Sequence, residues 1–246
     1  MTYSHIENKV LFKDDPPLLD SYLKAAGYPI SQTRSQVRSG FYNNWDDIYA
    51  SVPTESNDLS KIPGFYNIID FNGDVMIKGT DYAIPWVYSE IPQNSGSLTL
   101  GGDYKGFSVM IQFYGVSNVS HLESLSNFTN RLDVVFSHVA DHWTNTNMNA
   151  SSFVPRWRTS GQNIGDYYVY DASYVRLKTT EIAYTFDSKS LKKYGLSALR
   201  LYINGNNLAF WSKLPDDREA AWSGGSAGSG TYPTVKRVNL GIDVTF

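Results

Sequence analysis

The feature that most constrains the fold is a period-two alternation of apolar and polar residues in several short stretches of the chain. Successive side chains of a β-strand point to opposite faces of a sheet, so such a stretch forms a strand with one apolar face and one polar face. The alternation is clearest at the carboxyl end. Its apolar positions are Val238, Leu240, Ile242, Val244 and Phe246. Its other positions are Arg237, Asn239, Gly241, Asp243 and Thr245.

A second stretch predicts a β-hairpin. Residues 98–104 alternate, Lys105-Gly106 follows, and residues 107–114 alternate again. Two residues that include a glycine are typical of a tight hairpin turn. The apolar positions on the two sides match across this turn, so we expect one face of the hairpin to be apolar.

Three further stretches bring the expected number of strands to about six. Residues 172–186 alternate, but the phase changes near Lys178–Thr180, where a β-bulge would reconcile the two halves. Residues 199–204 form the next strand after a connector at 187–198. Residues 3–13 alternate more weakly and are a plausible sixth strand.

The connections between these strands differ in length in a regular way. They alternate between long and shorter segments, at roughly 14–93, 105–106, 117–170, 187–198 and 212–231. Outer-membrane barrels have long extracellular loops and short periplasmic turns, and their strands need only ~9–11 residues to cross the bilayer at a tilt. The pattern therefore favours an all-β, antiparallel transmembrane β-barrel segment with long extracellular loops.

A soluble β-sandwich is the alternative, because it also alternates polar and apolar residues. Sandwich strands usually have ~5–6 residues and short turns, whereas these strands and loops are longer. The two hypotheses differ most at the last strand. In a barrel, Leu240 faces lipid and Asn239 faces the lumen.

Composition narrows the class of function. Aromatic residues make up 15% of the 246 residues, which suits a membrane interface but also a carbohydrate-binding surface. The net charge of −3 argues against nucleic acid as a partner. No apolar run is long enough for a membrane-spanning helix. We find no nucleophile paired with a base, so an enzyme is not expected.

Several motifs, taken in order, resemble those of TonB-dependent outer-membrane transporters of the SusC/RagA type. Residues 70–74 match D-x-N-G-D, and residues 104–107 match Y-K-G-F. Residues 171–178 match D-x-S-Y-x-R-L-K, and 199–211 resemble the strand that follows in the family. Residues 232–246 resemble the closing Y-P … G-x-x-V-x-F strand. The similarity extends over essentially the whole chain.

The resemblance implies that residues 1–246 are the C-terminal part of a 22-stranded barrel, with the plug domain and the N-terminal strands absent from this sequence. It implies location in the bacterial outer membrane, in contact with lipid. It also implies a SusD-like surface lipoprotein as partner, TonB acting through the missing N-terminal part, and oligosaccharides or oligopeptides as cargo. A sheet of about six strands exposes unpaired backbone in lipid, so the segment alone should be inactive. The alternative is a soluble carbohydrate-binding β-sandwich domain.

One acidic loop suggests a calcium site. Asp70, Asn72, Asp74 and Asp81 occupy positions 1, 3, 5 and 12 of an EF-hand-like loop, whose oxygens could converge on Ca²⁺. Position 6 is Val75, where the sharp turn of an EF-hand requires glycine. The alternative is a surface turn rich in Asp and Asn. No other cofactor is expected.

Three tryptophans are candidates for contact with cargo. Trp86, Trp157 and Trp222 lie in the expected extracellular loops. An exposed indole can stack on a sugar ring, but it can equally fill the core of its own loop.

Overall fold

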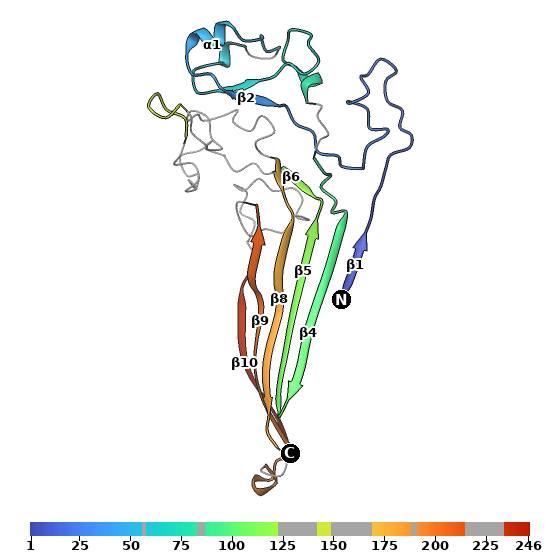
Figure 1. The fold of residues 1–246 in the computed structure, drawn as a ribbon, viewed down its shortest axis with the longest axis vertical. Coiled ribbons are helices and arrows are strands. Elements are labelled where there is room, and N and C mark those ends of the chain that lie inside the picture. Colours follow the sequence, from blue (N-terminus) through green and yellow to red (C-terminus); the bar gives the residue numbers. More distant parts are fainter. Residues whose placement is uncertain (56–57, 83–86, 123–141, 149–168, 188–190, 215–233) are drawn as a thin grey trace.

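The computed structural model describes the chain except residues 56–57, 83–86, 123–141, 149–168, 188–190 and 215–233. A long, narrow antiparallel sheet carries most of the described loops at one end (Figure 1). Its strands lie side by side in the order β1-β4-β5-β8-β9-β10. Their bounds are Thr2–His5, Asn94–Tyr104, Phe107–Ser117, Tyr174–Thr185, Ala198–Ser212 and Arg237–Thr245, respectively. The prediction of an all-β antiparallel fold is confirmed.

Smaller elements lie in the loops. Two short antiparallel pairs are β2 with β3 and β6 with β7. Their bounds are Arg38–Phe41, Tyr66–Ile68, Ser120–Leu122 and Val169–Asp171, respectively. The helical turns are α1 (Trp45–Tyr49), η1 (Asp58–Ser60), η2 (Gly79–Asp81) and η5 (Lys192–Tyr194). No helix in the described part of the chain is long and apolar enough to cross a membrane.

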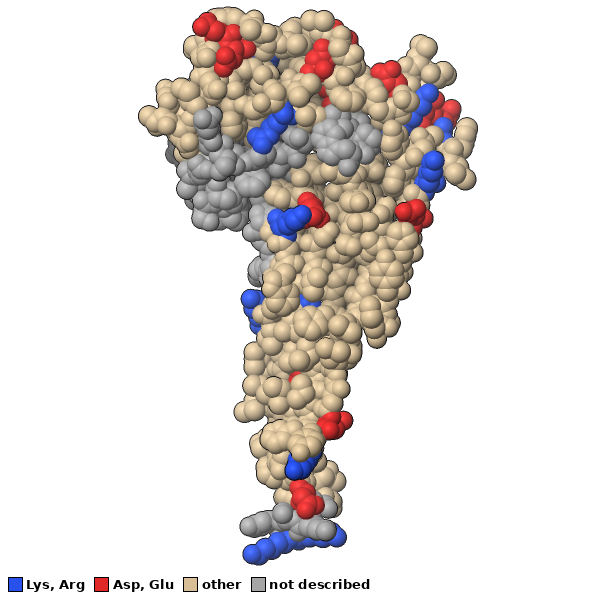
Figure 2. Space-filling model, in the orientation of Figure 1, with Lys and Arg blue, Asp and Glu red and all other residues tan. Residues whose placement is uncertain are grey.

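The strand register places the apolar positions of neighbouring strands opposite one another. Leu100 is opposite Ile111 in β4 and β5, and Leu240 is opposite Ile203 in β10 and β9. We call the surface formed by these positions the apolar face. Its most exposed members include Leu100, Tyr104, Phe107, Ile182, Ile203, Trp211, Val238, Leu240 and Ile242. An exposed apolar surface of this extent marks contact with an apolar environment. Figure 2 shows few charged side chains along the middle of the sheet.

Figure 1 shows the carboxyl terminus at the end of the sheet opposite the long loops. Aromatic rings of β5, β8 and the residue after β8 contact one another near the ends of these strands. The ring centroids of Phe107 and Tyr184 are 4.6 Å apart, and Tyr184 meets Phe186 edge-on at 4.9 Å. Phe246, the last residue, is 87% exposed. Rings at this level are typical of the aromatic girdle of an outer-membrane barrel.

The expected hairpin and bulge are both present. Lys105 and Gly106 have φ angles of 47° and 87°, the left-handed backbone that a two-residue hairpin of type I′ requires. A Cβ atom on Gly106 would lie 2.6 Å from the carbonyl oxygen of Thr185, so glycine is needed there. The register of β8 shifts between Leu177 and Thr179, within the segment where the phase change predicted a bulge.

The expected strand at 3–13 is shorter than predicted. β1 ends at His5, and one further hydrogen bond joins the amide of Ile6 to the carbonyl of Gln93. Beyond it, Val10 exchanges backbone hydrogen bonds with residues 27–28. The chain leaves the sheet because these amide and carbonyl groups are satisfied within the loop instead of by β4.

The loops begin and end close to the expected positions. The segments between sheet strands are 6–93, 105–106, 118–173, 186–197 and 213–236. The first and third carry the small strand pairs, and the short turns lie at the opposite end of the sheet (Figure 1). The alternation of long and short connections is confirmed.

The long loops have a core of their own. Tyr42, Tyr66 and Trp143 are almost completely buried. The indole nitrogen of Trp143 donates to the side-chain oxygen of Asn43 at 3.1 Å, which joins the loop at 118–173 to the loop at 6–93. Buried aromatic rings therefore hold two sequence-distant loops together at one end of the sheet.

Candidate functional site: the polar face of the sheet

The face opposite the apolar face carries polar and charged side chains, and we call it the polar face. In β10, Leu240 is 81% exposed on the apolar face. Its neighbour Asn239 lies on the polar face and donates its amide to the side-chain oxygen of Asn204, the residue opposite it in β9, at 2.8 Å. The two residues thus point to opposite sides of the sheet, as the alternation predicts.

Near the carboxyl-terminal end, three charged residues from three strands form a network on the polar face. Arg200 in β9 contacts Glu181 in β8 at 2.5 Å and Asp243 in β10 at 3.4 Å. The small side chain of Ala183, which is buried, lies between Glu181 and Thr185 on this face, so the guanidinium can reach along the sheet. These groups are partly exposed, so each ion pair contributes only about 0.2–1 kcal/mol. The network therefore contributes little to stability. Because Arg200 joins one residue of β8 and one of β10, it helps to fix the register of the three strands.

A tyrosine and a glycine form a second cross-strand contact beside this network. Tyr202 is opposite Gly241, and a Cβ atom on Gly241 would lie 2.2 Å from Cζ of the ring. The tyrosine ring therefore lies over the bare backbone of β10. Glycine in a strand often marks such a close approach.

The polar face changes character toward the loops. Arg176 is 1% exposed, and its guanidinium carbon lies 4.5 Å from the ring centroid of Phe210. Nearby, Val119 and Tyr174 are buried in a small apolar cluster that Tyr114 packs against. A cation–π contact that is shielded from water, like that of Arg176, is more stabilising than the same contact at the surface.

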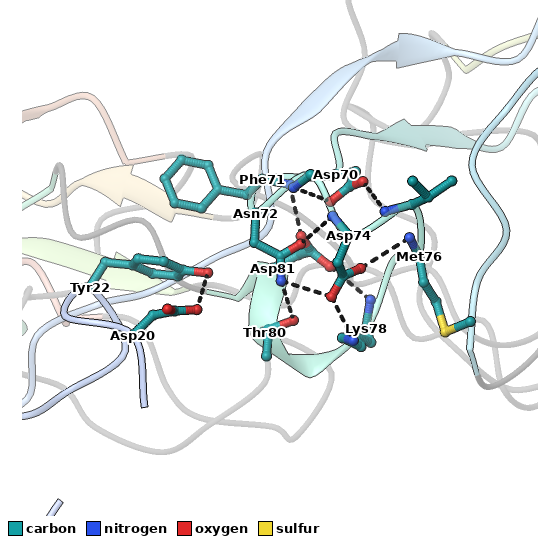
Figure 3. A network of polar contacts seen from close by, with 12 residues as sticks. Asp20, Tyr22, Asp70, Phe71, Asn72, Asp74, Met76, Lys78, Thr80 and Asp81 are labelled. Atoms are coloured by element: carbon teal, nitrogen blue, oxygen red, sulfur yellow. Dashed lines mark hydrogen bonds and ion pairs between the residues drawn. The ribbon is translucent and has the colours of Figure 1, made fainter. Parts of the chain in front are cut away.

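The acidic loop places the predicted calcium ligands close together, but their oxygens bind to the loop itself (Figure 3). Asp81 is fully buried and accepts hydrogen bonds from the amides of Phe71 and Lys78, both at 2.8 Å. Asp70 accepts from the amides of Gly73 and Val75 at 2.8 Å and 2.7 Å. The loop is therefore organised by carboxylates that cap backbone N–H groups, as in an Asp- and Asn-rich turn.

The remaining ligand candidates are similarly engaged. Asn72 donates to Asp74 at 2.9 Å, and Asp74 also contacts the ammonium group of Lys78 at 2.5 Å. The hydrogen bond from Lys78 lowers the pKa of Asp74, and the same contact raises the pKa of Lys78. A bound Ca²⁺ would have to displace these contacts. In the described part of the chain, no group of three or more His, Cys, Asp or Glu residues is placed to hold a metal ion.

Val75 occupies position 6 of this loop, where an EF-hand has a glycine at a sharp turn. Val75 has a φ of 64°, in the left-handed region that a β-branched residue rarely adopts. Such a conformation costs about 1–3 kcal/mol. The hydrogen bond from its amide to Asp70 helps to hold it.

Trp86, Trp157 and Trp222 all lie outside the described residues. Conversely, sequence reasoning missed the charged network around Arg200 and the buried Arg176. In the sequence, both arginines stand at polar positions of their strands, and this pattern was visible. Their contact partners were not, because the order and register of the strands are fixed only in the folded sheet.

Comparisons with known proteins agree with this geometry. Two curated proteins of Formosa agariphila, TonB-dependent receptors P26 and P3, are each 29% identical to the chain, over 192 and 203 residues. The matches cover 72% and 75% of this chain. Over about three quarters of its length the chain is thus similar to TonB-dependent receptors.

Solved structures of the RagAB peptide transporter share the fold. The RagAB peptide importer in its open-open state gives a TM-score of 0.58 at 19% identity and matches 86% of this chain. The RagAB peptide transporter gives 0.54 at 22% identity over 69% of this chain. No protein-family model matches the chain.

The shared fold explains the two faces of the sheet. The described strands are an antiparallel segment of a transmembrane β-barrel, in which one face meets lipid and the other meets the lumen. The chain spans about a fifth of the length of these receptors, 19% of each curated relative. Its relatives are receptors and transporters, not enzymes.

Proposed function

We propose that this chain forms the C-terminal part of the barrel of an outer-membrane importer of nutrients. The observation that carries the proposal is the pairing of an exposed apolar face with a polar, hydrogen-bonded face on the same long strands, with the long loops collected at one end. A barrel strand needs this division between lipid and lumen. A soluble sandwich would bury its apolar face against a second sheet.

The sheet edges indicate that the chain acts within a larger barrel. β1 and β10 are the outer strands of the main sheet, so each has one side without a partner strand among the described residues. Unpaired backbone groups in lipid cost several kcal/mol each. We therefore propose that further strands of the complete receptor close the barrel, and that this segment alone does not transport.

The proposed cargo is an oligosaccharide or an oligopeptide, taken up together with a SusD-like surface lipoprotein and driven through TonB. Support for import comes from the names of the relatives, which are TonB-dependent receptors, and from the RagAB structures, which are described as a peptide transporter and importer. The identity to the RagAB chains, 19–22%, supports the shared fold.

The proposal is tested in the native bacterium with an epitope-tagged full-length receptor. We expect the receptor in the outer-membrane fraction and in one complex with a SusD-like lipoprotein. Deletion of the gene should abolish growth on one cargo class, glycan or peptide, and growth should return on complementation only when TonB is functional. Recovery of the tagged protein in a soluble fraction that binds glycan would instead establish the β-sandwich alternative.

A further inference from the structure

A hollow opens on the polar face where the regular pairing of β8, β9 and β10 is interrupted. Its volume is about 420 Å³. It is lined by Lys178, Thr179, Asn206, Asn207, Val235 and Arg237. Three of these residues, Thr179, Asn206 and Arg237, are direct partners across the three strands. Because Arg237 alternates with Val238 of the apolar face, the hollow lies on the side of the lumen.

Two backbone irregularities create the hollow. Relative to β5, Lys178 is an extra residue of β8. On the other side of β8, two residues of β9, Asn207 and Leu208, lie against the single residue Lys178. On the facing strand, Asn207 has a φ of 55° and donates its side-chain amide to the carbonyl oxygen of Val235 at 3.3 Å. Bulges re-aim side chains and are often found next to functional sites. Here they bring a lysine and an asparagine toward the same space.

Among the described residues, the charge around the hollow is positive. Lys178 and Arg237 line it, and none of the other described lining residues carries a carboxylate. The carboxylates of Glu181 and Asp243, on the same face, both contact Arg200. Across the described ranges, neither Lys178 nor Arg237 has an ion-pair partner, although the ammonium group of Lys178 lies 5.0 Å from the ring centroid of Tyr114.

We propose that this hollow binds an anionic group of the cargo, a carboxylate, sulfate or phosphate. A guanidinium fork, an ammonium group, carboxamides and a hydroxyl supply several donors around one space, which is the chemistry that holds such oxyanions. The inference rests on the proposed import function, because it assigns the hollow to the lumen through which cargo passes. It makes acidic oligosaccharides or acidic peptides the preferred cargo.

Direct anion binding by the full-length receptor tests the inference. The receptor is purified from outer membranes in a neutral detergent at low ionic strength and titrated calorimetrically with sulfate and, separately, with acetate. We expect both to bind, with sulfate tighter if sulfated or phosphorylated cargo is natural and acetate tighter if the group is a carboxylate. Crystals soaked in selenate should show an anomalous peak in the hollow.

The variant K178Q/R237Q removes both charges and keeps the size of each side chain similar. Loss of two charge-assisted contacts should weaken anion binding at least about tenfold. The matched control is K236Q, which removes an exposed charge next to Arg237 that does not line the hollow. The control should bind as the wild type does.

Three results would overturn the inference: no anion binding by the wild type, equal binding by K178Q/R237Q, or an equal loss in K236Q. Transport is measured in parallel with neutral and acidic cargo of the same size. If no cargo is imported but the hollow binds anions as expected, only the proposed function fails. If neutral cargo is imported normally and K178Q/R237Q leaves acidic import unchanged, the role assigned to the hollow fails.

Discussion

An arginine placed at Leu240 should destabilise the full-length protein in the membrane and reduce its yield there. Leu240 is 81% exposed on the apolar face, so this side chain meets lipid in a barrel. Leu240 lies six residues before Phe246 along the last strand and the end of the chain. At ~3.4 Å per residue this is about 20 Å along the strand. A strand tilt of ~40° makes the rise about 15 Å.

The height of Leu240 above the carboxyl-terminal end of the strand determines how much free energy the arginine costs. If Phe246 lies in the periplasmic aromatic girdle, a rise of about 15 Å puts Leu240 near the middle of a ~30 Å hydrocarbon core. An arginine on the lipid face at the midplane costs about 2–4 kcal/mol. We therefore expect L240R in the full-length receptor to lower the free energy of unfolding by that amount and to reduce its yield in the outer membrane.

The matched control is N239R, one residue away on the polar face. Asn239 is opposite Asn204, which is in turn opposite Glu181, so the new charge would face a carboxylate across the lumenal surface. The hydrogen bond that is lost is exposed and contributes about 1 kcal/mol or less. Urea unfolding in lipid vesicles and outer-membrane yields measure both variants. Equal yields for L240R and N239R would refute the assignment of the two faces.

Three further results are expected. G241A would place a methyl group 2.2 Å from Tyr202, so it should destabilise the receptor by about 1–3 kcal/mol, and Y202A should restore most of the loss in a double-mutant cycle of urea unfolding. D81N leaves a buried backbone N–H facing an amide, so limited proteolysis should cleave the loop faster, and an unchanged rate would contradict the role of this carboxylate. The Asp74–Lys78 pair stabilises the loop above the unfolded pKa of Asp74 and below that of Lys78. Hydrogen-exchange protection of the loop should therefore fall as pH drops through the lowered pKa of Asp74 or rises through the raised pKa of Lys78. K78M should remove the dependence at high pH and weaken the one at low pH, where Asn72 and the amide of Met76 still lower the pKa of Asp74.

Part of the candidate site could be read from the sequence and part could not. The acidic loop was visible because its Asp and Asn residues are close in sequence, and local spacing is enough to bring them together. What their oxygens bind was not visible, because the amides of Phe71 and Lys78 compete with a metal ion for Asp81 only in the folded loop. The Arg200 network and the hollow beside Lys178 depend on strands joined by long loops, whose lengths carry no information about register.

The sequence by itself determined which face of each strand is apolar, where the hairpin turns at Lys105-Gly106, and that the strand at 172–186 needs a bulge. These properties are local, because side chains alternate along a strand wherever that strand lies in the sheet. Only the tertiary structure decided that β1 ends at His5 and which charges meet across β8, β9 and β10. Hydrogen bonding between strands fixes those pairings, and a shift of one residue in register would exchange every partner.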